Sequence, residues 1–148
     1  MRLCRFEQDG KAQAGFYFDD NIVSVAGAAK AVQAKSDLRA DLPAGDDLLG
    51  LLPHGKHHAD AKGVAAWLGK NPEAIKKFAV KGAKLRTPVP RPNKLFLLAG
   101  NYAKHIEEGG GIAVARAKTF PYVFMKPAST ALNHPDASIS IPKVSPDH

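Results

Sequence analysis

The sequence lacks several features that define particular protein classes. Among its 148 residues there is one cysteine, Cys4, so an internal disulfide is excluded and a reducing compartment is expected. No partner side chain lies near Cys4 in sequence, which predicts a small buried hydrophobic residue rather than a nucleophile. No apolar run is long enough to cross a bilayer, and the strand-like N-terminus does not resemble a leader. A cytoplasmic protein without membrane association is therefore expected. Repeats and coiled-coil heptads are also absent.

Acidic residues are scarce relative to basic ones. The chain has 14 aspartates and glutamates against 21 lysines and arginines, which gives a formal net charge of +7 at pH 7. Basic residues crowd the stretch from Lys76 to Lys94, yet the only aromatic residue among them is Phe78. Nucleic-acid-binding segments usually interleave aromatic residues with cations. We therefore predict a solvated basic face without specific nucleic-acid binding, and keep a noncatalytic, polyanion-binding or assembly module as the alternative class of function.

The first 86 residues predict a β-meander followed by short helices. Strands are expected over residues 1–6, 14–18 and 22–25. Helices are expected over residues 26–33, 46–52, 60–68 and 72–78, the last with Asn71 as its cap and Pro72 in its first turn. Three prolines lie within the seven residues from Thr87 to Asn93, so an extended linker is expected there.

The most informative stretch runs from Leu95 to Glu108. The apolar run Leu95–Ala99 predicts a buried strand, and Gly100 follows it at a strand-to-helix turn. If a helix begins after Gly100, His105 and Glu108 lie on one face, where the carboxylate can orient the imidazole as a general base. An H-x-x-E pair alone is a weak signal, and a solvated helix face is the alternative.

Further motifs follow the His105 and Glu108 pair in the sequence. Pro121–Pro127 predicts a short apolar strand that bears Lys126, and a turn around His134 precedes an alternating strand over residues 137–142. This order resembles the fumarylacetoacetate hydrolase family, whose catalytic domain begins with a Pro-x-Lys strand, a Gly-(x)-Asn-Tyr-x-x-His-x-x-Glu turn and helix, and a Phe-x-Lys-Pro strand. The resemblance runs from about Pro88 to the end of the chain. One departure is that Gly100 directly precedes Asn101, where many members carry a residue between them.

The resemblance implies a fold and an activity. The fold is a β-rich α+β protein with a small N-terminal domain at residues 1–86, a proline-rich linker at 87–93 and the beginning of a mixed-β catalytic domain at 94–148. The activity is C–C bond hydrolysis, hydration, decarboxylation or isomerisation of a small 2-oxo or β-diketo acid, usually in a homodimer. Family members bind Mg²⁺, Mn²⁺ or Ca²⁺ through a Glu-x-Glu pair and a later acidic residue, and these carboxylates are absent here. The chain therefore resembles an N-terminal portion, inactive by itself.

The resemblance also implies roles for individual residues. His105 is the base, and Glu108 holds its tautomer and stabilises the imidazolium. Lys126 directs its ammonium group toward a substrate oxygen or carboxylate, and a strand-end lysine in water is the alternative. Asn101 and Tyr102 belong to the turn, where their side chains either support the substrate or only pack.

The remaining histidines and the glycine-rich loop have simpler interpretations. His54, His57 and His58 lie in a polar segment without regularly spaced cysteine or carboxylate ligands, which favours a loop over a metal cluster. His134 is predicted to be exposed in its turn. The segment from Gly109 to Thr119, which includes Arg116, predicts a flexible loop that closes over the site.

Overall fold

The computed structural model describes residues 1–114, 118, 120–141 and 143–144, and the chain divides into two compact units. One unit comprises residues 1–90 together with the segment from Asn133, and the other comprises residues 91–132. Helices hold 29% and strands 23% of the described residues, which confirms the α+β class without an excess of strand. The division after Pro90 falls inside the predicted linker, whereas the segment from Asn133 belongs to the first unit, where the Asn133 carbonyl and the His134 imidazole contact Thr87.

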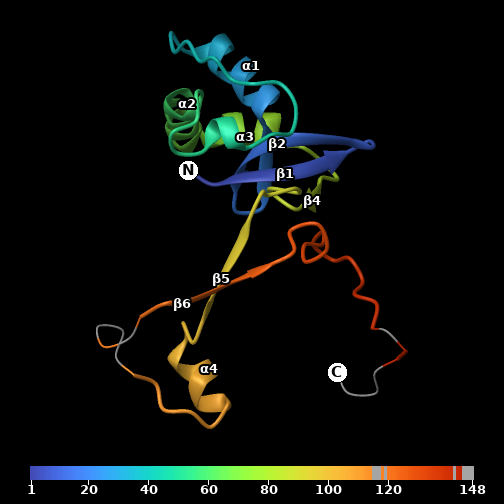
Figure 1. The fold of residues 1–148 in the computed structure, drawn as a ribbon. Coiled ribbons are helices and arrows are strands. Elements are labelled where there is room, and N and C mark those ends of the chain that lie inside the picture. Colours follow the sequence, from blue (N-terminus) through green and yellow to red (C-terminus); the bar gives the residue numbers. More distant parts are fainter. Residues whose placement is uncertain (115–117, 119, 142, 145–148) are drawn as a thin grey trace. The chain divides into compact units, whose positions relative to one another are not determined.

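The first unit is built on a four-stranded antiparallel sheet in the order β3-β2-β1-β4 (Figure 1). Its strands are β1 (Leu3–Gln8), β2 (Lys11–Phe18), β3 (Asn21–Ser24) and β4 (Lys84–Arg86). The first three form the predicted meander, joined by tight turns in which Asp9, Gly10 and Asp19 adopt positive φ. The sequence analysis missed β4, because Lys-Leu-Arg has little intrinsic strand preference. It forms by pairing with β1, where Arg86 makes a 3.0 Å ion pair with Glu7.

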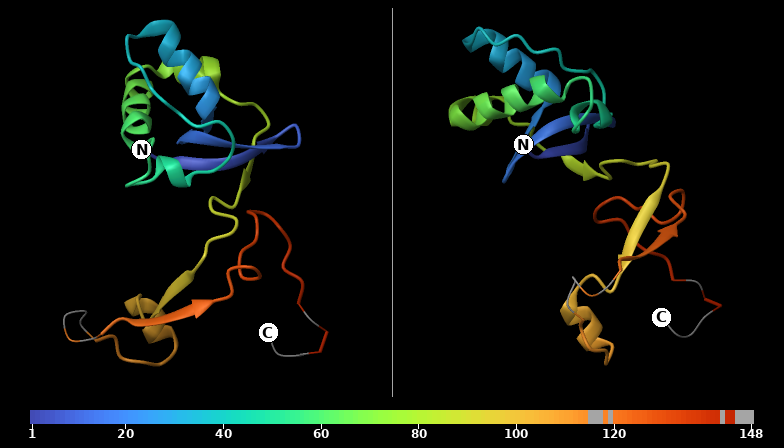
Figure 2. Two further views of the ribbon diagram at one scale, coloured as in Figure 1. Left: turned by 45° about the horizontal axis from the view of Figure 1, so that its top comes forward. Right: turned by 60° about the vertical axis from the view of Figure 1, so that its left-hand side comes forward.

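Three α-helices cover one face of this sheet, as all three views show (Figures 1 and 2). They are α1 (Val25–Lys35), α2 (His58–Lys70) and α3 (Pro72–Phe78), and each was predicted. The helix predicted over residues 46–52 is wrong in length, since only the single 3₁₀ turn η1 (Leu49–Leu51) forms. The Asp47 carboxylate accepts the Leu49 N–H at 2.9 Å, which holds the chain in this tight turn.

Helix α3 begins where the sequence predicts. Asn71 occupies the cap position and Pro72 the first helical position. The Asn71 side chain makes no capping bond to α3; its amide instead donates to the Trp67 carbonyl at 2.7 Å. It therefore satisfies an orphan carbonyl at the end of α2 rather than an amide at the start of α3.

The main core lies between the sheet and the helices. Its fully buried side chains include Phe16 and Val23 from the sheet, and Val32, Val64 and Leu68 from the helices. A smaller cluster of Cys4, Phe6 and Ile22 forms a second apolar group. Gly15 is required beside this cluster, because a Cβ there would lie 2.9 Å from the Phe6 ring.

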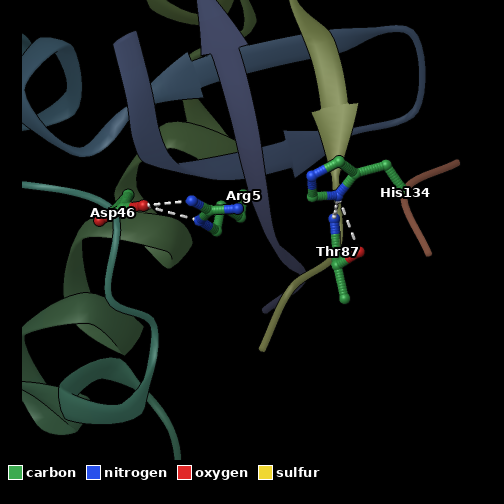
Figure 3. Close-up of polar contacts among 4 residues, drawn as sticks. All are labelled: Arg5, Asp46, Thr87 and His134. Atoms are coloured by element: carbon green, nitrogen blue, oxygen red, sulfur yellow. Dashed lines mark hydrogen bonds and ion pairs between the residues drawn. The ribbon is translucent and has the colours of Figure 1, made fainter. Parts of the chain in front are cut away.

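A half-buried ion pair fixes the loop before η1 to the sheet (Figure 3). Arg5 on β1 donates its Nε–H to Asp46 Oδ2 at 2.7 Å, and its Nη2 forms an ion pair with the same oxygen at 2.6 Å. The neighbouring Gly45 carbonyl accepts the Ala14 amide of β2 at 3.0 Å. The long connection between α1 and η1 is thus held by the sheet rather than by secondary structure of its own.

The second unit is a two-stranded antiparallel sheet with one short helix. Strand β5 (Leu95–Ala99) pairs with β6 (Tyr122–Lys126), and α4 (Ala103–Glu108) follows β5 after a turn. The predicted strands and helix are confirmed. The predicted burial of β5 is wrong, since Phe96 is 60% and Leu98 47% exposed. Within the described residues no second layer covers this sheet, so its apolar side chains lack the contacts that burial requires.

The strand predicted over residues 137–142 is also wrong for the residues described there. Residues 137–141 form no strand, and Ile139 is 84% exposed. An alternating pattern becomes a strand only when a neighbouring edge supplies hydrogen bonds, and no described strand pairs with this segment. Pro142 and the terminal residues 145–148 lie outside the described part of the chain. Through the described ranges, no helix combines the length and apolar character needed to cross a membrane.

Candidate functional site

The turn between β5 and α4 is where the sequence places its candidate site. Gly100 has φ +62°, a left-handed conformation that side chains disfavour, so glycine is required for this turn. Tyr102 occupies the cap position of α4, and its carbonyl accepts the Ile106 amide at 3.2 Å. The turn therefore changes the backbone from strand to helix within three residues and sets the direction of α4.

His105 and Glu108 lie on one face of α4, as their spacing predicts. His105 Nδ1 is 3.6 Å from Glu108 Oε2, and the two side chains are 79% and 75% exposed. This separation suits an ion pair with a protonated imidazole and is slightly too long for a hydrogen bond. Because water surrounds both groups, the solvated-face alternative also agrees with this geometry.

A hollow of about 740 Å³ lies beside the turn, wholly within the second unit. Its lining is mainly apolar and includes Asn101, a residue whose side chain can donate and accept hydrogen bonds. His105 and Glu108 are not among its described lining residues. The described lining is Leu98, Ala99, Gly100, Asn101, Ala103, Ile106, Ala113, Val114, Phe120, Pro121 and Val123.

The structure separates Lys126 from the other candidate residues along the sheet. The strand register places Lys126 opposite Leu95, whereas Tyr122 lies opposite Ala99 beside the Gly100 turn. Four residues of strand span about 13 Å. Lys126 is thus at the far end of the sheet from the turn, while Asn101, Tyr102, His105 and Glu108 are close in sequence at the near end.

The described residues do not form a metal site. Nowhere in the described ranges do three histidine, cysteine, aspartate or glutamate side chains gather closely enough to hold an ion. His57 and His58 each direct Nδ1 to a backbone carbonyl, that of Asp41 at 2.7 Å and that of Leu51 at 2.9 Å. These bonds fix the loop before α2 and account for the histidine-rich segment without a metal. The described residues therefore do not supply the ligands for the divalent ion that the family resemblance implies.

Cys4 has the properties of a buried structural thiol. It is 6% exposed on β1, and its burial raises the thiol pKa to about 11. A thiol with so high a pKa forms little of the nucleophilic thiolate at neutral pH. The prediction that Cys4 is buried is confirmed.

One polar cluster was missed by the sequence analysis. Thr87 is 8% exposed, and its hydroxyl donates to the Asn133 carbonyl at 2.8 Å and lies 2.9 Å from His134 Nδ1 (Figure 3). The Thr87 amide also donates to His134 Nδ1 at 3.3 Å. These residues are 46 and 47 positions apart, so no local pattern could have indicated the contact.

The segment after α4 is described only in part. The Gly111 amide donates to the Ile106 carbonyl at 2.9 Å, and Gly110 has φ +77°, so the glycines terminate the helix. Ile112 is 89% exposed. Arg116 and Thr119 lie outside the described residues, and closure of this loop over the site remains a prediction.

Comparison with known protein families and with curated protein sequences finds no match to either. The resemblance to the fumarylacetoacetate hydrolase family therefore depends on the residues and spacings quoted above.

Proposed function

We propose that this chain contributes the amino-terminal part of a fumarylacetoacetate hydrolase-type enzyme, cytoplasmic and dimeric, that acts on a small 2-oxo or β-diketo acid. One observation carries the proposal: His105 and Glu108 share a face of α4, 3.6 Å apart, directly after a left-handed glycine turn. The hollow beside the turn and the polar Asn101 on its wall supply a place for a small substrate.

The proposed chemistry follows from the side chains at the turn. Neutral His105 accepts a proton from water or from a carbon next to the substrate carbonyl, and Glu108 stabilises the resulting imidazolium. Asn101 donates a hydrogen bond to a substrate oxygen. Since both His105 and Glu108 are exposed here, the pair becomes effective when other polypeptide covers it and excludes water. Lys126, which lies at the opposite end of the sheet from the Gly100 turn, is given no part in this step.

The divalent ion of the family would supply Lewis-acid polarisation of a substrate carbonyl. The described residues lack a ligand set for it, and in this proposal its carboxylates come from the remainder of the enzyme. The chain alone is expected to bind Mg²⁺ or Mn²⁺ weakly, because hard cations need several oxygen ligands. Titration calorimetry giving tight one-to-one binding to the chain alone would contradict this part of the proposal.

Activity tests the proposal as a whole. The 148-residue chain and the polypeptide encoded by its reading frame through and beyond His148 are assayed with 2-oxo and β-diketo acids, with and without Mg²⁺. Turnover is expected from a longer polypeptide that carries a Glu-x-Glu strand. A stop codon after His148, together with no turnover of any substrate, would favour the noncatalytic alternative.

That alternative has one observation in its favour, the excess of exposed cations around Lys76–Lys94 in a chain of net charge +7. If these cations form only a solvated face, DNA or RNA association is weak, independent of sequence and lost at moderate salt. Fluorescence anisotropy with two unrelated DNA duplexes across a salt series distinguishes a solvated basic face from a nucleic-acid-binding module. Sequence-selective binding at physiological salt would overturn the enzyme proposal.

A further inference from the structure

The sheet formed by β5 and β6 is apolar on both of its faces. Directly opposed residues share a face, so Phe96, Leu98, Val123 and Met125 form one and Leu97, Phe124 and Tyr122 contribute to the other. On the first face Phe96 is 60% and Met125 64% exposed; on the second Tyr122 is 79% exposed. A sheet with one face in water normally alternates apolar and polar residues. These strands have the composition of strands that are covered on both sides.

The edges of this sheet are open as well. Within the described residues the sheet has only two strands, so β5 and β6 each present one unpaired edge of backbone N–H and C=O groups. Such an edge accepts a further strand through main-chain hydrogen bonds. Apolar faces and open edges together describe a surface that is completed by a strand-forming polypeptide.

The charge of the second unit indicates which kind of polypeptide would complete this sheet. Residues 91–132 contain two acidic residues, both on α4, against six basic ones. Lys94 directly precedes β5, and Lys126 ends β6 opposite Leu95, so both lysines lie at the same end of the sheet. Neither forms an ion pair with any residue that the structure describes. A second copy of this unit would bring more positive charge to a positive surface, which is unfavourable.

We infer that the β5–β6 sheet is a docking surface for an acidic, strand-forming polypeptide, whose apolar strand extends the sheet and whose carboxylates meet Lys94 and Lys126. This inference depends on the exposure and charge of the sheet and goes beyond the proposed activity. It holds whether or not His105 acts as a base, and it is measured by binding alone.

The test uses two fluorescent peptides, each with five valines flanked at both ends by two glutamates or by two lysines. Anisotropy titrations with the 148-residue chain at low salt are expected to give about tenfold tighter binding of the glutamate peptide. Phe96→Glu should weaken that binding by about tenfold or more, because it places a charge on the apolar face. The double variant Lys94→Glu, Lys126→Glu should reverse the preference between the peptides.

Leu49→Glu is the matched control, since Leu49 is a 56% exposed leucine of the first unit. It should leave peptide binding unchanged, and circular dichroism should show the same thermal transition for every variant. Equal binding of both peptides, or no binding of either, would overturn the inference. Sedimentation that shows a dimer of the chain, dissociated by Phe96→Glu, would assign the surface to a second copy and overturn it too.

Discussion

Thr87 and His134 are 47 residues apart and are joined by two polar contacts, from the Thr87 amide at 3.3 Å and the Thr87 hydroxyl at 2.9 Å to the imidazole Nδ1 (Figure 3). Thr87 directly follows β4, and His134 begins a turn in which its carbonyl accepts the Ala137 amide at 3.2 Å. This contact explains why the segment from Asn133 belongs to the first unit. The proline-rich stretch is thus anchored at its first residue.

Replacing Thr87 with valine should loosen this anchor. The substitution keeps the side-chain shape and removes the hydroxyl that donates to the Asn133 carbonyl at 2.8 Å. A lost hydrogen bond of this kind costs about 1 kcal/mol, so the Ala137 amide should exchange with deuterium about five times faster. Thr130→Val, at an exposed position, is the control and should leave that exchange rate unchanged. Unchanged exchange in Thr87→Val would show that the contact does not hold the segment.

The pairing of Glu7 with Arg86 predicts a dependence of stability on pH. The hydrogen bond from Arg86 lowers the pKa of the Glu7 carboxyl below its ordinary value of 4.5. A lowered folded-state pKa contributes stability above the unfolded-state pKa, and this contribution is lost as pH falls through the folded-state value. Glu7→Gln should therefore lower the urea midpoint at neutral pH and have progressively less effect below about pH 4.

Glu73→Gln is the comparison for this variant, because Glu73 pairs with Lys76 at 3.3 Å where both side chains are strongly exposed. It should change the urea midpoint less than Glu7→Gln at neutral pH. If the Glu7→Gln difference stayed constant down to pH 2, the ion pair with Arg86 would not be its cause.

Cys4 should be inert in the folded protein. With a pKa of about 11 and 6% exposure, its thiol reacts with a disulfide reagent such as Ellman's reagent only when the first unit opens. We expect slow labelling at pH 8 and complete labelling within the mixing time in 8 M urea. Rapid stoichiometric labelling without denaturant would contradict the burial of β1.

The sequence predicted those helices and strands that are determined by residues close together in the chain. The β-meander, three of the helices, strand β5 and helix α4 were predicted because periodicity, turn residues and Pro72 act within a few residues. The short strand β4 was not, because the edge of β1 rather than its own sequence makes it a strand. For the same reason the alternation at residues 137–141 was misleading, since no described edge pairs with it.

In the candidate site, too, features set by local spacing were predicted and features set by strand pairing were not. The H-x-x-E spacing was enough to place His105 and Glu108 on one face of α4. Spacing along the chain could not show that Lys126 lies at the other end of the sheet, because that depends on the register of β5 with β6. It also could not show that the apolar strands are exposed, since burial depends on what other polypeptide covers them.

The proposed base defines the decisive variants. His105→Ala removes the base, and Glu108→Gln keeps the size of the side chain while removing the charge that favours the imidazolium. Glu107→Gln is the matched control, because it makes the same change on the adjacent residue of α4, which forms no described ion pair with His105.

The central measurement is the kcat of these variants. It is made in the longest polypeptide from this reading frame that turns over a 2-oxo or β-diketo acid. We predict that His105→Ala lowers kcat by about 10²- to 10⁴-fold, that Glu108→Gln lowers it less, and that Glu107→Gln leaves it nearly unchanged. The double variant of His105 and Glu108 should be little worse than His105→Ala alone, because the two groups act as a unit. A near-normal kcat for His105→Ala, or equal losses for Glu107→Gln and Glu108→Gln, would contradict the proposed function.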